Sequence, residues 1–175
     1  MAEIIRFEMV RLPAMRMIGK QVLVKAGDET TVPSLWRRCL MDGSMFTLES
    51  LRQWHAASLL VDTTEAYVGW MGSWRSRDVF RYLAGMLMKP NCPVPHGYEA
   101  VDLPASEMAL GWVRGKQTEV FGQEADLKKR IDRTAYRQGD WGMEVYAWSR
   151  FPNRDENGEV ILDLYHAVER QYEYA

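Results

Sequence analysis

The segment Leu12-Pro13-Ala14-Met15-Arg16-Met17-Ile18-Gly19-Lys20 has a counterpart in Leu103-Pro104-Ala105-Ser106-Glu107-Met108-Ala109-Leu110-Gly111. In both copies a Leu-Pro-Ala step opens a strand-like run that ends near a glycine. The chain after each copy also matches in order, with a helical stretch and then two strands that form a hairpin. Two copies of one strand–helix–strand–strand unit predict an α+β domain with pseudo-two-fold symmetry, an antiparallel sheet and a ligand cleft between the halves.

The first copy is expected over about residues 1–89. Hydrophobic periodicity and turn residues predict extended structure at 4–12, 14–25, Ala66–Trp74 and Val79–Met88, with a helix at 33–42. Pro33 suits the start of that helix and Gly43 lies just past its end. One helix face would carry Leu35, Trp36, Cys39 and Leu40. A short second helix is expected from Thr47, a favourable N-cap residue.

The proline-rich segment 89–97 is expected to be a linker. The second copy would then occupy about residues 98–175, and the whole chain, 1–175, would form one domain. Its expected strands are Tyr98–Leu103, Ala105–Gly115, Met143–Phe151 and Val160–Val168. A helix is expected over 118–137, ended by Gly139, with its charged run in solvent.

Composition excludes several classes of protein. Lys and Arg total 22 against 24 Asp and Glu, so the chain of 175 residues lacks the basic excess typical of nucleic-acid binders. The two cysteines form no disulfide framework. Neither a signal peptide nor an apolar run long enough to span a membrane is evident, so a cytoplasmic protein with no membrane partner is expected.

The chain is rich in Trp, Tyr and Met, with 7, 8 and 11 residues. These side chains supply large, polarisable contact area, which suits either a bulky core or a binding cavity. Composition alone leaves the two alternatives open, so the positions of the residues along the strands must separate them.

The strand Met143–Phe151 carries the candidate site. Side chains alternate across a sheet, so one face would hold Met143, Val145, Ala147 and Phe151 and pack against a helix. The other face would present Glu144, Tyr146 and Trp148. This face is either a solvated sheet edge or the wall of an aromatic cavity around one acid. Such a cavity would attract an organic cation through ring quadrupoles and the carboxylate, and burial would raise the pKa of Glu144.

Other strands offer aromatic partners for the same cavity. Because one face of each strand lines a central cleft, we expect Trp70, Tyr82 and Trp112 to join Tyr146 and Trp148 around Glu144. Each of these rings has an alternative place in the core.

Other catalytic patterns are missing. The three histidines have no metal-ligand spacing with each other or with the cysteines, and phosphate-loop, dinucleotide and nucleophile-elbow motifs are lacking. We therefore expect no metal and no cofactor. Any catalysis would rest on Glu144, assisted by Tyr or Trp donors.

Three segments resemble GyrI-like small-molecule-binding domains. Val94-Pro95-His96-Gly97-Tyr98-Glu99-Ala100-Val101-Asp102-Leu103-Pro104-Ala105 resembles the opening of their second half. Met143-Glu144-Val145-Tyr146 is similar to their E-x-Y signature, and Val160–Val168 fits their closing strand.

The resemblance implies two β-α-β-β units around a ligand cleft, as in the effector-binding domains of AraC- and MerR-type regulators. The family's acid, which aligns with Glu144, faces lipophilic cationic ligands. Stand-alone members sequester drugs, inhibit gyrase or hydrolyse cyclopropane-containing toxins. Because no helix-turn-helix module flanks this domain, direct binding to nucleic acid is not expected.

Three functions are compatible with these features. The first is binding or sequestration of lipophilic, cationic, drug-like molecules at Glu144 and the aromatic side chains. The second is hydrolysis of cyclopropane-containing or similar electrophilic toxins, with Glu144 as general acid or base. The third is interaction with an unidentified protein partner such as a gyrase subunit. Turnover separates the first two, and a stable macromolecular complex would indicate the third.

Overall fold

The structure, a computed structural model, describes residues 1–172. Along the chain the elements are β1 (Glu3–Leu12), β2 (Met15–Lys25), α1 (Thr31–Met41), α2 (Ser44–Glu49), the 3-10 turns Arg52–Trp54 and Ala57–Leu59, β3 (Ala66–Gly72), β4 (Val79–Met88), β5 (Glu99–Leu103), β6 (Ser106–Lys116), α3 (Glu124–Ile131), β7 (Tyr136–Ala147) and β8 (Glu159–Arg170). No helix in this part of the chain is long and apolar enough to cross a lipid bilayer.

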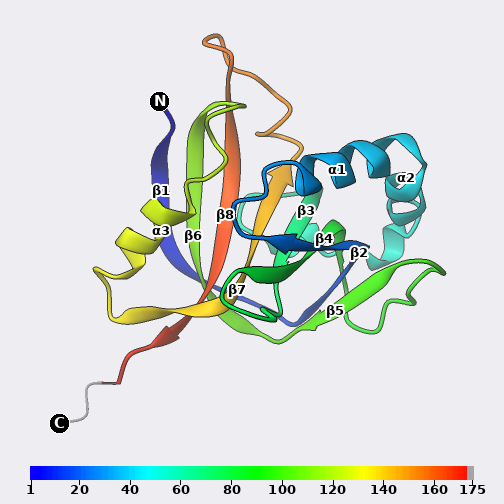
Figure 1. The fold of residues 1–175 in the computed structure, drawn as a ribbon, viewed down its shortest axis with the longest axis horizontal. Coiled ribbons are helices and arrows are strands. Elements are labelled where there is room, and N and C mark those ends of the chain that lie inside the picture. Colours follow the sequence, from blue (N-terminus) through cyan, green and yellow to red (C-terminus); the bar gives the residue numbers. More distant parts are fainter. Residues whose placement is uncertain (173–175) are drawn as a thin grey trace.

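The strands form one antiparallel sheet in the order β1-β6-β8-β7-β3-β4-β2-β5 (Figure 1). Exchanging β1 with β5, β2 with β6, β3 with β7 and β4 with β8 gives the same order read from the other end. The predicted α+β fold with pseudo-two-fold symmetry is therefore confirmed. β7 and β3 meet at the centre of the sheet, and their pairing is the seam between the halves.

The Leu-Pro-Ala steps explain how the halves interlock. Pro13 and Pro104 lack an N–H group, so each interrupts the strand ladder between two consecutive strands. After the first break β2 pairs with β4 and β5, whereas β1 pairs with β6 of the second copy. The first strand of each copy thus joins the sheet of the other half. Leu12 and Leu103, which precede the two prolines, are both buried in the shared core.

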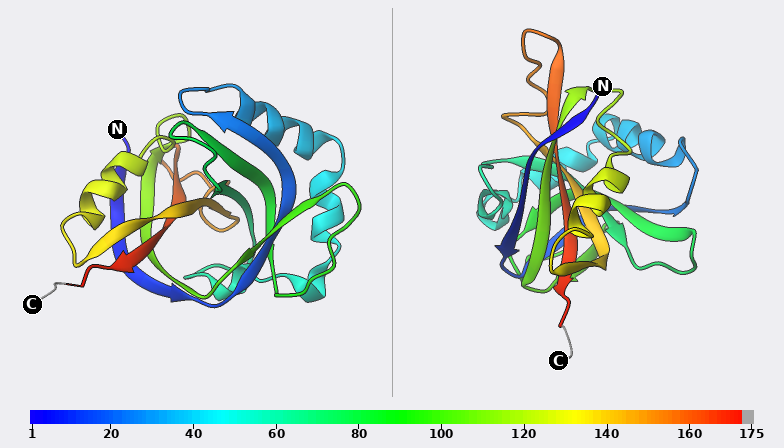
Figure 2. Two further views of the ribbon diagram at one scale, coloured as in Figure 1. Left: turned by 60° about the horizontal axis from the view of Figure 1, so that its bottom comes forward. Right: turned by 90° about the vertical axis from the view of Figure 1, so that its left-hand side faces the viewer.

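A single core cluster lies on the inner side of the sheet. It joins Leu12 of β1 with Leu103 of β5, although these strands are at opposite edges of the sheet order. The sheet can bring its edges to one cluster because it curves strongly (Figure 2). Alternate residues of β3 and β7, including Val68, Trp70 and Val145, fill this inner side.

The helices cover the outer side in two separate places (Figure 2). α1 and α2 pack on β2 and β4, where Leu35, Cys39 and Leu48 are buried. α3 packs on β6 and β8, where Leu127 and Ile131 are buried. The outer face of the central strands β3 and β7 thus lies between two helical layers, one from each half.

The helical predictions need three corrections. α2 begins at Ser44 instead of Thr47, because Asp42 accepts hydrogen bonds from the Ser44 backbone N–H at 2.9 Å and from its hydroxyl. α3 covers only Glu124–Ile131 instead of 118–137, because Gly122 adopts a left-handed φ of 81° that interrupts a helix. Gly139 does not end a helix but lies within β7, where the pairing with β8 shifts register between Gln138 and Gly142.

Candidate functional site

Glu144 lies at the centre of the outer face, on β7 beside β3. Its side chain is buried, with the residue only 8% exposed. Within residues 1–172 it forms no ion pair. A buried carboxylate without a cationic partner costs free energy, which makes Glu144 a candidate functional group.

Two tyrosines hold one oxygen of this carboxylate. Tyr146 donates a hydrogen bond of 2.6 Å to Glu144 Oε2, and Tyr82 donates one of 3.3 Å to the same atom. Trp36 Nε1 in turn donates to the Tyr82 hydroxyl at 2.8 Å. Glu144 Oε1 accepts no hydrogen bond from the described residues, and it is not among the polar atoms sealed from solvent. Oε1 is therefore free to accept a hydrogen bond from a ligand or to form an ion pair with a cationic ligand.

The surroundings tune Glu144 to titrate near neutral pH. Burial raises its pKa to about 7, against the lowering effect of the hydrogen bonds from Tyr146 and Tyr82, and the charge of Glu124 adds to the increase. Burial also raises the pKa values of Tyr82 and Tyr146, so both phenols stay protonated donors. The carboxyl group can exchange a proton, or pair with a cation, under mild conditions.

Gly69 makes the Tyr82 contact possible. It pairs directly with Glu144 across β3 and β7. A Cβ atom at Gly69 would lie 1.9 Å from the Tyr82 hydroxyl and 3.3 Å from Glu144 Oε2. Only a residue without a side chain leaves room for the tyrosine to reach the carboxylate.

A cavity of about 860 Å³ opens above Glu144, between the two helical layers. Its size is within the usual range of small-molecule sites. Most of its wall is aromatic or aliphatic, and the aromatic residues are Trp36, Tyr67, Phe80, Tyr82, Phe121, Tyr146 and Phe151. Rings from both halves take part, as expected for a cleft at the seam.

Tyr146 lies at the centre of this aromatic group. Its ring centroid is 4.9 Å from that of Phe151 and 5.3 Å from that of Trp36, both in edge-to-face geometry. On the side of α3, the ring centroid of Phe121 lies 6.4 Å from that of Tyr146. The arrangement presents several ring faces and edges to a ligand while a hydrogen bond fixes Tyr146 on Glu144.

The charged side chains that line the cavity in the described part of the chain are all acidic. Four carboxylates line it, from Asp28, Glu29, Glu124 and Glu144, and no Lys, Arg or His among the described residues does so. Aromatic faces and carboxylates both attract organic cations. The arrangement can therefore hold an aromatic cation, or transfer a proton to or from a bound molecule.

Comparisons with known proteins identify the fold. SAV2435 bound to tetraphenylphosphonium matches with a TM-score of 0.67 and 14% identity, over 94% of each chain. The EcmrR C-terminal domain matches with a TM-score of 0.63 and 10% identity, over 94% of this chain and 98% of that one. The chain has the GyrI-like fold. A hydrolase encoded by lin2189 from Listeria innocua matches with a TM-score of 0.51 and 13% identity, over 94% and 92% of the chains. No family model and no curated protein sequence matches the chain.

Three of the six predicted site residues meet in this GyrI-like fold. Glu144, Tyr146 and Tyr82 lie together in the cavity, joined by hydrogen bonds. The other predicted rings lie elsewhere. Trp70 is buried on the inner face of the sheet, and Trp148 is 37% exposed beyond the end of β7, edge-on to Tyr67.

Trp112 is also on the inner side of the sheet. The guanidinium carbons of Arg6 and Arg150 lie over its ring, at 4.7 and 4.2 Å from the ring centroid. Arg150 forms an ion pair of 2.5 Å with the buried Asp163, which is directly opposite Trp112 in the pairing of β6 and β8. The expectation that Trp112 and Trp70 share a cavity with Glu144 is wrong, because both rings project from the opposite face.

Five rings of the cavity are not among the predicted site residues: Trp36, Tyr67, Phe80, Phe121 and Phe151. Trp36 belongs to a second apolar stripe of α1, at four-residue spacing with Val32 and Leu40, beside the core stripe of Leu35 and Cys39. This stripe also explains why Leu40, predicted to pack with Leu35, is 59% exposed: it lines the cavity mouth.

Phe121 and Phe151 approach the cavity from loops. Phe151 was expected on the helix-packing face of its strand, but β7 ends at Ala147, so strand alternation no longer sets its direction. Phe121 was expected in a helix and lies in the connection before α3. A fixed period in the sequence cannot reveal ring directions in loops.

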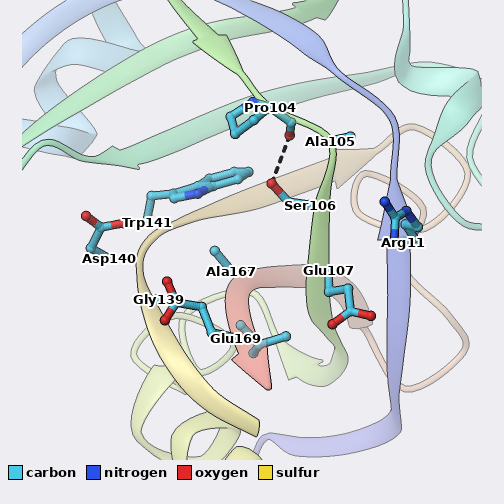
Figure 3. Close-up of a pocket in the computed structure, with 11 residues that line it drawn as sticks. Arg11, Pro104, Ala105, Ser106, Glu107, Gly139, Asp140, Trp141, Ala167 and Glu169 are labelled. Carbon is cyan, nitrogen blue, oxygen red and sulfur yellow. Dashed lines mark hydrogen bonds between the residues drawn. The ribbon is translucent and has the colours of Figure 1, made fainter. Parts of the chain in front are cut away.

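A second, smaller hollow of about 360 Å³ lies away from Glu144, where the β5–β6 turn meets β7 and β8 (Figure 3). It is lined by charged side chains of both signs, including Arg11, Glu107 and Glu169, and by small residues such as Ala105 and Ala167. It has neither the aromatic wall nor the buried carboxylate of the first cavity, which is therefore the better candidate for a ligand site.

Proposed function

We propose that the protein binds aromatic organic cations in the cavity above Glu144. The observation that carries the proposal is the buried Glu144 carboxylate, which has no cationic partner among the described residues and leaves Oε1 open to the cavity. A ligand cation would supply the missing countercharge while the surrounding rings cover its apolar surface.

The comparison with SAV2435 supports this proposal, because that protein of the same fold is bound to the lipophilic cation tetraphenylphosphonium. The acidic side chains that line the cavity support it independently. We further propose that the protein acts in the cytoplasm on small molecules, either as a sequestering protein or as a sensor, and does not itself bind nucleic acid.

The test uses two ions of nearly the same shape and opposite charge. Tetraphenylphosphonium and tetraphenylborate both present four phenyl rings, so any difference in affinity reports the charge preference of the site. We expect calorimetry to show tetraphenylphosphonium binding with a Kd at least about tenfold lower, and Glu144→Gln to weaken it by about 1–3 kcal/mol. Equal affinities, or an unaffected Glu144→Gln variant, would refute the proposal.

A second candidate function is hydrolysis of an electrophilic substrate. It is favoured by the pKa of about 7 for Glu144, which suits a general acid or base at neutral pH, beside two phenol donors. The hydrolase from Listeria innocua shares the fold. Incubation with a cyclopropane-bearing electrophile, followed by mass spectrometry, separates the two functions. A product that requires Glu144 would indicate an enzyme, and intact recovery of a bound compound would indicate a binding protein.

A further inference from the structure

The mouth of the cavity carries carboxylates from both halves of the molecule. Asp28 and Glu29 lie in the connection between β2 and α1, and Glu124 is the first residue of α3. α1 and α3 lie on opposite sides of the sheet's centre (Figure 1). All three acids are exposed, and all three line the same cavity as the buried Glu144.

These carboxylates are not neutralised by the protein. Among residues 1–172, none of the three takes part in an ion pair. The Thr31 hydroxyl donates a hydrogen bond to Asp28, and the backbone N–H groups of Thr30 and Thr31 donate to it at 2.8 and 3.2 Å. These hydrogen bonds hold the pKa of Asp28 well below its usual range. Asp28 therefore presents a fixed negative charge beside the opening.

Position at a helix start gives part of the explanation for these acids, because carboxylates stabilise the positive end of a helix dipole. The helix dipole does not explain why no Lys, Arg or His among the described residues lines the cavity between the helices. Nor does it explain the buried carboxylate at the floor, whose Oε1 is open to the same space. Negative charge is thus placed at two depths of one cavity, at the floor and at the mouth.

The two levels influence each other. The charge of Glu124 contributes to the raised pKa of Glu144, so the acid at the mouth acts electrostatically on the carboxylate at the floor. A ligand with one cationic group can compensate the charge of Glu144 at the floor and leaves the carboxylates at the mouth without a countercharge. A ligand with a second cationic group can compensate both.

We propose that the preferred ligands carry two cationic centres, one bound beside Glu144 within the aromatic wall and the second held in water among Asp28, Glu29 and Glu124. The chemical class is an aromatic cation with a flexible arm that ends in an ammonium group. This inference rests on the proposed function, because it names the substrate class of the same site.

A matched pair of dyes tests the inference. Ethidium and propidium share one phenanthridinium chromophore, and propidium adds a quaternary ammonium on a short alkyl arm. Fluorescence titration at low ionic strength is expected to give a Kd for propidium about fivefold lower than for ethidium. The advantage should shrink as salt is added, because exposed charges are screened.

The double variant Glu29→Gln/Glu124→Gln shows whether the mouth acids cause the difference. It should move the ratio of the two Kd values toward one, with only the part due to Asp28 remaining, and because a ratio is compared, a small change in helix stability does not enter. The matched control is Glu99→Gln/Glu156→Gln, which removes the same total charge at two exposed residues outside the cavity. The control should keep the wild-type ratio.

The outcomes separate this inference from the proposed function. If neither ethidium nor tetraphenylphosphonium binds, the proposed function fails and this inference fails with it. If ethidium binds and propidium binds no more tightly, the inference alone is overturned. It is also overturned if the double variant and its control change the ratio equally, because the effect would then come from net charge.

Discussion

Gly69 and Glu144 face each other across the pairing of β3 and β7, and they occupy equivalent positions in the two copies. The repeat matches Leu12 with Leu103, which fixes the correspondence between β2 and β6. The pairing registers of β4 with β2 and β3, and of β8 with β6 and β7, then make Gly69 the counterpart of Glu144. The pseudo-two-fold axis therefore passes between a glycine and an acid. An acid on both strands would place like charges directly opposite each other, whereas glycine leaves one carboxylate on the axis and room for Tyr82.

Gly69→Ala should disturb the site from within the sheet. The new Cβ would lie 1.9 Å from the Tyr82 hydroxyl, so the tyrosine must move and lose its hydrogen bonds with Glu144 and Trp36. We expect a loss of about 1–3 kcal/mol in the free energy of unfolding, measured by urea denaturation. In a Tyr82→Phe background the loss should be smaller, because the atom nearest to the new Cβ is absent. Equal losses in the two backgrounds would show that Tyr82 does not depend on Gly69.

The stability of the protein should depend on pH through Glu144. Its pKa is about 7 in the folded protein against an ordinary value of 4.5, so the folded state holds this proton more tightly than the unfolded state. The contribution is fully present below the unfolded value and is lost as the pH rises through about 7. The full difference corresponds to about 3 kcal/mol.

Urea denaturation at about pH 5 and pH 8 measures this effect when wild type is compared with Glu144→Gln. Wild type should lose about 2–3 kcal/mol more than the variant between the two pH values. Subtracting the variant cancels other buried groups such as Asp163. Parallel pH profiles for the two proteins would mean that Glu144 is not desolvated as the structure has it.

Affinity for a cation should change in the opposite direction with pH. A bound cation favours the ionised carboxylate, so tetraphenylphosphonium should bind more tightly as the pH rises from about 6 to 8. Below the pKa of Glu144, each pH unit should weaken binding by up to about tenfold. Calorimetry in buffers of different ionisation enthalpy should detect proton release on binding near pH 7. A pH-independent Kd in wild type would exclude Glu144 as the countercharge.

The two tyrosines should affect this pH profile unequally. Both hydrogen bonds lower the pKa of Glu144, and the bond from Tyr146, at 2.6 Å, is shorter than the bond from Tyr82, at 3.3 Å. Tyr146→Phe should therefore move the midpoint of the binding profile upward by about one pH unit, and Tyr82→Phe by less. Tyr136→Phe, on the same strand but outside the cavity, is the control and should leave the midpoint in place. A larger effect of Tyr82→Phe would reverse the assigned order.

The sequence predicts the part of this molecule that obeys a regular period. The repeated Leu-Pro-Ala steps indicate the symmetry, and strand alternation places Glu144 and Tyr146 on one face. Strand alternation does not identify which face of β3 lines the cavity, because Tyr67 and Trp70 are both bulky aromatic residues and lie on opposite faces. No pattern within that strand indicates which one faces the cavity. That choice depends on how the sheet curves and on where α1 packs.

The tryptophans provide the sharpest test of the assigned faces. Trp36 donates to Tyr82 and lies edge-on to Tyr146 in the cavity, so Trp36→Phe should weaken tetraphenylphosphonium binding by about 1 kcal/mol. Trp70→Phe and Trp112→Phe change rings on the inner side of the sheet, so they should lower the free energy of unfolding and leave the Kd unchanged. Calorimetry on the folded variants, alongside urea denaturation, separates binding from stability. A weakened Kd in Trp112→Phe, with Trp36→Phe unaffected, would place the ligand on the inner face and remove Glu144 from the site.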